Sequence, residues 1–238
     1  MASNTGSQHI SHKFDEEMEN LRNQVLKMGG LVEEQINGAV NAFIKANAPD
    51  AESIILKDHK VNSLEVSIDE ACTQILARRQ PAASDLRMVV AVIKTITDLE
   101  RIGDEAERIA KMALNLAEEN AGFNSRYAGI RHLGDQVKQM IHDVLHAFAR
   151  MDVDAAIKVV RDDDETDKEY QNLIRMLITY MMEDPRTISE VLDVIWAARA
   201  LERIGDHAKN IGEYVIYLVK GKDIRHLDIE IVEKDILS

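Results

Sequence analysis

The hexapeptide LERIGD occurs twice in this chain, at Leu99–Asp104 and again at Leu201–Asp206. Other residues recur 105 positions apart, the first set being matched in order by the second: Gly29, Val32, Ile36, Ala42, Phe43 and Ala51, then Gly134, Val137, Ile141, Ala147, Phe148 and Ala156. Self-similarity at a fixed period indicates tandem copies of one structural unit. The repeat therefore predicts a fold made of two related halves.

Apolar residues recur every three or four positions along most of the chain, which is the period of an amphipathic helix. One such stripe consists of Leu21, Val25, Met28, Val32, Ile36, Val40 and Phe43. Only 3 prolines, 11 glycines and 4% aromatic residues are present, so there are few signals for turns or strands. We expect an all-α fold, with six helices in two tandem, pseudo-symmetric three-helix bundles.

Prolines are expected to separate the helices within each half. Pro49 is predicted to end the first helix, while Pro81 and Pro185 break the chain before the third helix of each half. Helices are predicted near residues 21–43, 54–76, 86–113, 134–148, 153–182 and 188–219. The first unit is predicted over residues 10–120, the second over 124–221, and an irregular tail over 222–238.

Composition excludes several classes of protein. A net charge of −13 argues against binding to nucleic acid, which requires a basic surface. The apolar runs are too short to cross a membrane, and the N-terminus lacks the basic and apolar segments of an export signal. The single Cys72 cannot form an internal disulfide and suits a reducing compartment. A cytoplasmic protein without membrane insertion is expected.

No group of residues in the sequence resembles a catalytic apparatus. Cys72 lies on an apolar stripe, which is typical of a packed residue rather than an activated nucleophile. The glycine-containing stretches KMGG and VKGK lack the spacing of a phosphate-binding loop. The chain is expected not to be an enzyme, and no catalytic residue is assigned.

The LERIGD repeats place acidic residues in pairs. Glu100 and Asp104, like Glu202 and Asp206, are four positions apart and therefore lie on one helix face, one turn apart. Two like charges at this spacing repel each other, so a compensating group is expected nearby. The glycine between each pair costs about 1 kcal/mol in a helix interior, which indicates close approach of a neighbouring helix or ligand.

The preceding helix of each half carries a second polar pair with the same spacing: Asp58 and Asn62 in the first half, Asp163 and Asp167 in the second. The midpoints between these pairs and the LERIGD acids fall at Pro81 and beside Pro185. Antiparallel helices joined at these prolines would therefore bring the two pairs of each half to the same height.

Four oxygen donors converging from two helices favour a hard metal site, suited to iron, manganese, magnesium or calcium, with zinc as a further candidate. The alternative is a solvated acidic surface, with Arg101 and Arg203 in ordinary salt bridges. A ferritin-like carboxylate oxidase or iron store is a rival class, but it typically carries Glu-x-x-His, which neither LERIGD contains. The third interpretation is a plain helical scaffold, in which the acids only solvate the surface.

Several longer stretches strengthen one interpretation: MGGLVEEQI, IDEACTQILARRQPAASDLR, FARMD and TYMMEDPRTI, together with the two LERIGD repeats. With these motifs the chain resembles the PhoU family from His9 to about Lys222. The resemblance implies a six-helix dimeric protein that is not an enzyme. It also implies a negative regulator of phosphate uptake and of the phosphate-starvation response.

The expected partners are the phosphate ABC transporter and a phosphate-sensing histidine kinase, which such a cytosolic adaptor connects, alongside a second copy in a homodimer. The resemblance further implies iron or zinc bound by motifs that match Glu100, Asp104, Glu202 and Asp206, with Asp163 and Asp167 as an additional match. Asp58 is also present, but Asn62 stands where a second acid is expected. Because Asn62 brings no charge, the first site is expected to bind metal more weakly.

Overall fold

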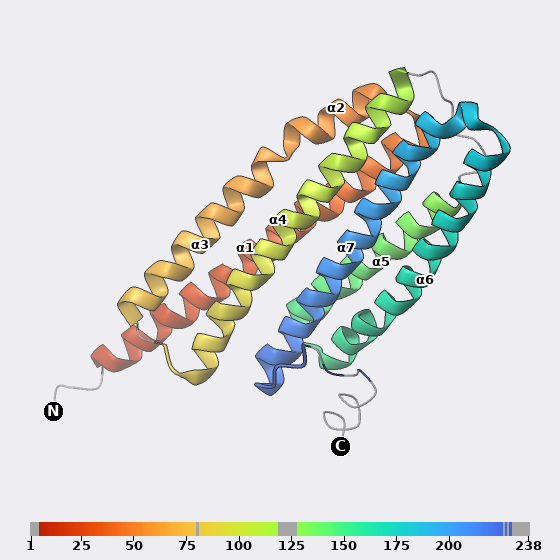
Figure 1. The fold of residues 1–238 in the computed structure, drawn as a ribbon. Helices are drawn as coiled ribbons and strands as arrows, with labels where there is room; N and C mark the ends of the chain where they lie inside the picture. The colour runs from red at the N-terminus through yellow and green to blue at the C-terminus, as the bar shows by residue number, and fades with distance from the viewer. Residues whose placement is uncertain (1–4, 80, 119–127, 226, 228, 230–238) are drawn as a thin grey trace.

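A computed structural model gives the fold and describes residues 5–79, 81–118, 128–225, 227 and 229 (Figure 1). Its elements are α1 (Thr5–Lys45), α2 (Ala48–Lys57), α3 (His59–Arg79), α4 (Ala83–Glu118), α5 (Ala128–Arg150), α6 (Val153–Glu183), the 3-10 turn η2 (Pro185–Thr187) and α7 (Ile188–Lys220). Over these residues no strand is formed. The all-α prediction is confirmed.

The helices form two groups, as the sequence predicts (Figure 1). In the first group α1, α4 and the α2–α3 pair pack against one another, and in the second α5, α6 and α7 do so. α2 and α3 together replace one predicted helix, which is interrupted at Asp58. The unit boundaries at 10–120 and 124–221 stay predictions, since residues 119–127 lie outside the described part; so does most of the predicted tail.

The interruption at Asp58 has no proline or glycine to mark it. Asp58 keeps helical dihedral angles, φ −56° and ψ −36°. Its N–H donates to Ile55 O at 3.4 Å, and its carbonyl accepts from Val61 N at 2.9 Å, so both bonds span three residues instead of four. This local tightening is a 3-10 feature. It leaves the direction of the chain helical but places Asp58 at a junction.

The two halves turn their first corner in the same way. Ala46 and Met151, which are 105 positions apart, both adopt positive φ angles of 45° and 54°. The next residues, Asn47 and Asp152, cap the following helix by accepting a hydrogen bond from the backbone N–H three residues on. α1 therefore ends at Lys45, and Pro49 lies in the first turn of α2. The expectation that Pro49 ends the first helix was wrong, because proline is well tolerated in a first helical turn.

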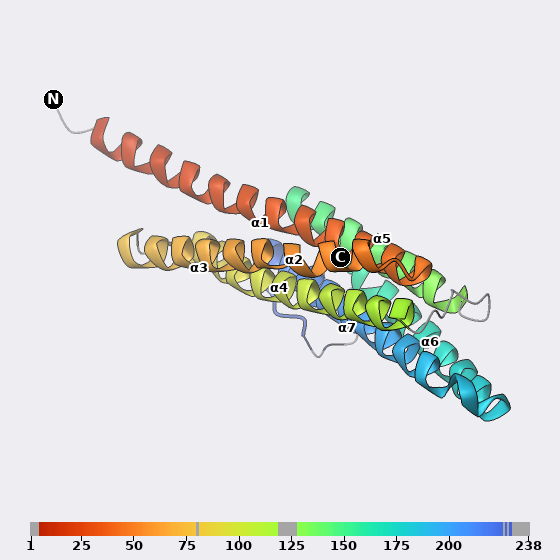
Figure 2. The ribbon, with the colours of Figure 1, turned by 90° about the horizontal axis from the view of Figure 1, so that it is seen from above.

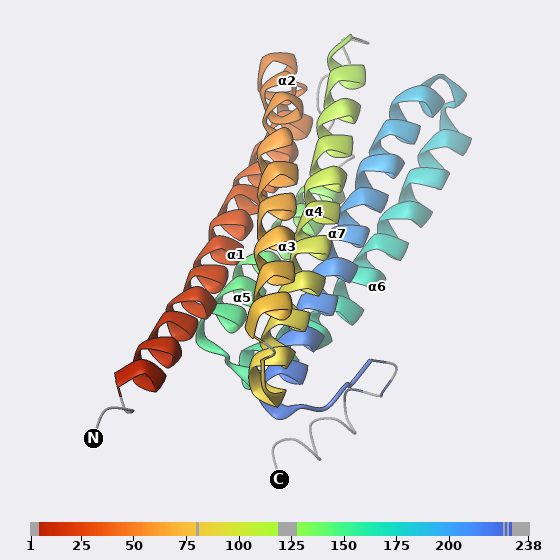
Figure 3. The same cartoon turned by 90° about the vertical axis from the view of Figure 1, so that its left-hand side faces the viewer.

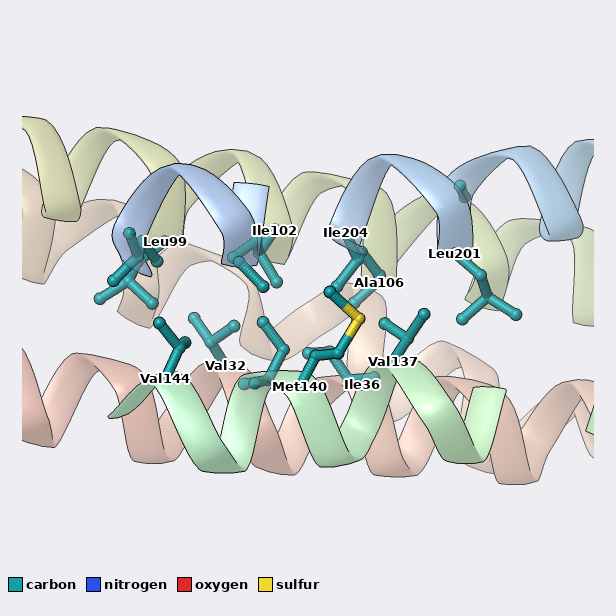
Figure 4. Packing of buried hydrophobic residues seen from close by; sticks show 14 of the residues in the cluster. Val32, Ile36, Leu99, Ile102, Ala106, Val137, Met140, Val144, Leu201 and Ile204 are labelled. Carbon is teal, nitrogen blue, oxygen red and sulfur yellow. The ribbon is translucent and has the colours of Figure 1, made fainter. Parts of the chain in front are cut away.

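The central helices of both halves share one apolar core. α4 packs along α7, and α1 lies against α5. Figure 4 shows side chains from all four helices meeting between these pairs: Val32 and Ile36, Leu99, Ile102 and Ala106, Val137, Met140 and Val144, and Leu201 and Ile204. Nearly all of the buried apolar residues belong to a single continuous cluster. The two repeats are therefore joined by packing and not only by the chain.

Seen from above and from the side, the helices run alongside one another, and the N-terminal turns of α1 diverge from the neighbouring α3 and α4 (Figures 2 and 3). α7 ends at Lys220 and is capped by Gly221, whose φ of 71° is the left-handed conformation that glycine adopts without strain. The predicted stop at this residue is confirmed. In the described part of the chain, no helix is long and apolar enough to span a bilayer.

Polar residues are also buried where α4 meets α7. The Asp98 carboxylate is 3% exposed and is 2.7 Å from His207 Nδ1 and 3.3 Å from Asn210 Nδ2, both on α7. Burial and the neighbouring Asp98 carboxylate raise the pKa of the Tyr214 hydroxyl. Asp98 thus links α4 of the first half to α7 of the second through hydrogen bonds that water cannot replace once buried.

Replacing Asp98 with Ala is expected to lower the free energy of unfolding by about 3 kcal/mol, because buried donors of His207 and Asn210 lose their acceptor. Urea denaturation followed by circular dichroism measures the loss. Glu70→Ala, an exposed change on α3, is the control and is expected to change stability by less than about 0.5 kcal/mol. Equal effects of the two changes would contradict the role assigned to Asp98.

Candidate metal centres

The structure divides the eight predicted site residues into two clusters, one in each half. The first cluster consists of Asp58 at the α2–α3 junction, Asn62 on α3, and Glu100 and Asp104 on α4. The second cluster consists of Asp163 and Asp167 on α6, and Glu202 and Asp206 on α7. Each cluster therefore lies between the two helices on either side of a proline: α3 and α4 around Pro81, and α6 and α7 around Pro185. The two pairs of each cluster lie at matching heights, as the sequence predicts.

The glycines of the LERIGD repeats show how closely these helices approach. A Cβ atom added to Gly103 would lie 3.3 Å from Asp58 Oδ1, and one added to Gly205 would lie 3.5 Å from Asp163 Oδ1. The facing carboxylate thus lies directly against each glycine. The expectation of close approach at these glycines is confirmed for a neighbouring helix.

The second cluster is the more compact. Carboxylate oxygens of Asp163, Asp167 and Asp206 all lie within 4.8 Å of one another. Asp163 is 1% exposed, whereas Asp167 is half-buried and Asp206 is exposed, so the group opens from the helix interface to solvent. Within the described ranges, this is the one group of three acidic, His or Cys residues with such spacing.

Two basic residues partly neutralise the second cluster. Lys209 Nζ contacts Asp163 Oδ2 at 2.8 Å, and Arg199 forms an ion pair with Glu202. The other oxygen of each acid, Asp163 Oδ1 and Glu202 Oε2, is buried without a hydrogen-bond partner. Burial followed by the charge of Asp206 raises the pKa of Glu202, and burial raises that of Asp163 against the opposing effect of Lys209. Two buried acceptors therefore lack a donor or cation.

The first cluster uses neutral partners instead. Gln35 Nε2 on α1 donates to Asp58 Oδ1 at 3.2 Å, and Asn62 Nδ2 donates to Asp58 Oδ2 at 2.9 Å. The amide oxygens of both partners, Gln35 Oε1 and Asn62 Oδ1, are buried without a hydrogen-bond partner. This cluster likewise presents buried oxygen acceptors that no donor satisfies.

The α4 acids complete the first cluster electrostatically. Burial, then the charge of Asp104, raises the pKa of Glu100; burial, then the charge of Asp58, raises the pKa of Asp104. The carboxylates are therefore close enough to repel one another across the helix interface. Such repulsion is what a bound cation would relieve.

Three partners of the clusters were not predicted from the sequence: Gln35, Arg199 and Lys209. Lys209 follows Asp206 by three residues and Arg199 precedes Glu202 by three, so helical spacing carried a signal for both. Gln35 had no such signal, because it lies on a different helix from the acids, next to Ile36 of an apolar stripe.

Arg203, one of the two arginines considered for ordinary salt bridges, lies outside the clusters. It pairs with Glu105 Oε1 of α4 at 3.0 Å. Glu105 is itself 2% exposed and also contacts Arg108 at 3.0 Å. This ion pair reinforces the interface of α4 with α7, whereas the acids of the LERIGD repeats face the hairpin partner.

The raised pKa values predict a pH dependence of the metal-free protein. A carboxyl group whose pKa is higher in the folded than in the unfolded state favours folding when protonated, so stability falls as the pH rises through the raised values. For Glu202 and Asp167, stability is expected to fall at pH values above the ordinary pKa values of these groups, 4.5 and 3.8. The double variant Asp167→Asn with Glu202→Gln is expected to be more stable than the parent at neutral pH. Its stability is also expected to fall less steeply as the pH rises.

Thermal unfolding from pH 4.5 to 8 in the presence of a chelator measures this dependence. The control is Glu165→Gln with Glu183→Gln, which neutralises two exposed acids of α6 and is expected to follow the parent protein. Parallel pH profiles for the parent and the cluster variant would show that the carboxylates do not destabilise the fold.

Comparison with known proteins identifies the family. The family model described as PhoU domain matches residues 25–113 and 130–215. A phosphate-specific transport system accessory protein PhoU homolog from Pseudomonas putida is 54% identical over 222 residues, covering 93% of this chain and 86% of the relative. The phosphate-specific transport system accessory protein PhoU from Escherichia coli (strain K12) is 46% identical over 228 residues, covering 96% and 94%.

Solved structures agree with these sequence matches. The crystal structure of PhoU from Pseudomonas aeruginosa superposes with a TM-score of 0.85 at 53% identity, covering 88% of this chain and 100% of that one. The phosphate transport system regulatory protein PhoU from Streptococcus pneumoniae gives a TM-score of 0.81 at 32% identity, covering 88% and 98%. With its duplicated three-helix unit and its paired LERIGD glycines, the chain belongs to the PhoU family.

Proposed function

We propose that this chain is an accessory regulator of phosphate uptake that acts by binding other proteins. The observation that carries this proposal is the nearly full-length likeness to relatives named as phosphate-specific transport system accessory proteins. One solved relative is named a phosphate transport system regulatory protein. Because the likeness includes both repeats, the regulatory role of such proteins fits the chain as a whole.

The finer role that we propose is negative regulation. The chain restrains the phosphate ABC transporter and keeps a sensor histidine kinase inactive when phosphate is plentiful, and so connects the two proteins as a cytoplasmic adaptor, itself a homodimer. A binding role suits the chemistry of the chain better than catalysis. Burial raises the pKa of the Cys72 thiol to about 12, so this thiol stays protonated and is a poor nucleophile.

We further propose that both clusters bind metal ions, iron or zinc among them. The residues fit such ions because, within the two clusters, the buried atoms without hydrogen-bond partners are all acceptors: Gln35 Oε1, Asn62 Oδ1, Asp163 Oδ1 and Glu202 Oε2. Asp58, Asn62, Glu100 and Asp104 would hold one centre, and Asp163, Asp167, Glu202 and Asp206 the other. A bound cation supplies positive charge between repelling carboxylates. It therefore strengthens the contact of α3 with α4 and of α6 with α7.

Deleting the gene tests the regulatory role. In a host carrying a phosphate-starvation reporter, deletion is expected to activate the reporter in high phosphate, because the inhibitory contact with the kinase is lost. Reintroducing the gene should silence it again. A reporter that stays silent in high phosphate after deletion would overturn the proposed function.

Metal analysis of the purified protein tests the second centre. The triple variant Asp163→Asn, Asp167→Asn and Asp206→Asn keeps the side-chain shapes but removes three charges, and it is expected to lose the metal bound there, measured by inductively coupled plasma mass spectrometry after incubation with Fe²⁺ or Zn²⁺. Asp154→Asn with Glu165→Gln and Glu183→Gln makes the same change of charge at exposed positions of α6. Equal metal content in both triple variants would sink the assignment.

A further inference from the structure

The two clusters are built on matching frameworks, but one position differs in kind. Gly103 is approached by Asp58 Oδ1 and Val61 Cγ1, at 3.3 and 3.5 Å from an added Cβ atom. Asp163 Oδ1 and Thr166 Cγ2 approach Gly205 in the same way, both at 3.5 Å. Asp163 and Thr166 each lie 105 positions after their counterparts, so the repeat places equivalent side chains around equivalent glycines.

The third neighbour of each glycine breaks this equivalence. It is Gln35 Oε1 at 3.3 Å from the added Cβ of Gly103, but Met140 Cε at 3.8 Å from that of Gly205. Met140 follows Gln35 by 105 positions and points from α5 toward the α4–α7 pair (Figure 4). Its sulfur accepts a hydrogen bond from Thr166 Oγ1 at 3.2 Å, and its methyl group lies at Gly205, where Asp163 Oδ1 also approaches. The first half thus has an amide oxygen where the second half has a methyl group.

The charge on the central acid is also balanced differently. Asp163 forms an ion pair with Lys209, whereas the hydrogen bonds to Asp58 come from two neutral amides, those of Gln35 and Asn62. Asp58 is 8% exposed, and a buried carboxylate without a cationic partner is costly. The first cluster therefore has more to gain from a bound cation at its central acid than the second cluster has.

The side chain of Gln35 indicates that the first cluster binds a ligand. Its side chain is 3% exposed, and its Oε1 has no hydrogen-bond partner although it lies beside Asp58 Oδ1 at Gly103. Asn62 Oδ1 is a second buried oxygen without a partner, on the other side of the same carboxylate. Neutral amide oxygens combined with carboxylates form the donor set that Ca²⁺ uses, whereas transition metals gain more from nitrogen and sulfur donors.

We propose that Gln35 is a cation ligand of the first cluster and makes that cluster an all-oxygen site for a hard divalent cation of the Ca²⁺ class, different in preference from the second cluster. This inference rests on the proposed metal binding and deepens it. Asp58, Asn62 and Gln35 supply the buried oxygens, and Glu100 and Asp104 supply further charge. Asn62 is then a suitable ligand rather than a deficit, in contrast to the expectation from sequence that the first site is the weaker one.

Isothermal titration calorimetry with Ca²⁺ tests the proposal on the full-length, metal-free protein. The background is the triple variant Asp163→Asn, Asp167→Asn and Asp206→Asn, which leaves the first cluster intact. Gln35→Met, which copies the second half, is expected to weaken Ca²⁺ binding at least 10-fold, since one oxygen donor is lost. Gln35→Glu keeps an oxygen at the same place and is expected to bind Ca²⁺ at least as tightly as the parent.

Gln24→Met is the matched control, because Gln24 is a half-buried glutamine on the same helix that lies away from both clusters. It is expected to leave the Ca²⁺ affinity unchanged. The reciprocal test is a double variant, Gln35→Met with Met140→Gln, in which Asp163, Asp167 and Asp206 are unchanged. This variant is expected to bind Ca²⁺ again, now at the second cluster. This gain of binding keeps the test decisive even where Gln35→Met alone destabilises the fold.

The outcomes separate the two proposals. Ca²⁺ affinity that is unchanged in Gln35→Met overturns the role of Gln35, as does a natural chain that binds Mn²⁺ or Zn²⁺ at the second cluster but no Ca²⁺. A natural chain that binds none of these cations overturns the proposed metal binding itself. Loss of Ca²⁺ in Gln35→Met with its return in Gln35→Glu supports the inference.

Discussion

The packing of α4 against α7 is the contact on which the rest of the molecule depends. Both helices carry a LERIGD segment, and each presents one face to a core shared with α1 and α5 and another to its own hairpin partner. Buried polar links cross the same interface, from Asp98 to His207 and from Glu105 to Arg203. These directional bonds fix how α4 sits along α7, because a displaced helix would leave buried charges without partners.

The same geometry determines where the acids can lie. With one face of α4 and α7 committed to the core, the carboxylates one turn apart in each LERIGD must face α3 or α6. The glycine in each motif lets the facing acid approach the helix backbone. Burial, and after it repulsion among these groups, raises several of their pKa values, which is an energetic cost. A fold that keeps such a cost is well suited to a function that depends on binding cations.

Much of this arrangement was predictable from local patterns. Helical periodicity predicted the all-α fold, and the midpoints at Pro81 and beside Pro185 predicted which polar pairs lie at the same height. The corner before Pro49 was misjudged because proline in a first helical turn and proline after a helix look alike in sequence. The break at Asp58 was missed because no residue type marks it.

The sequence by itself determined that two copies of a three-helix unit exist and that each carries carboxylates one turn apart on a helix face. These are properties of period and spacing along the chain. Only the tertiary structure decided that Gln35 joins Asp58, although 23 residues separate them, and that a methyl group of Met140 takes the equivalent place in the other half. The physical reason is that a third helix, α1 or α5, brings these side chains to the clusters, and helix packing rather than periodicity selects which of its residues faces each glycine.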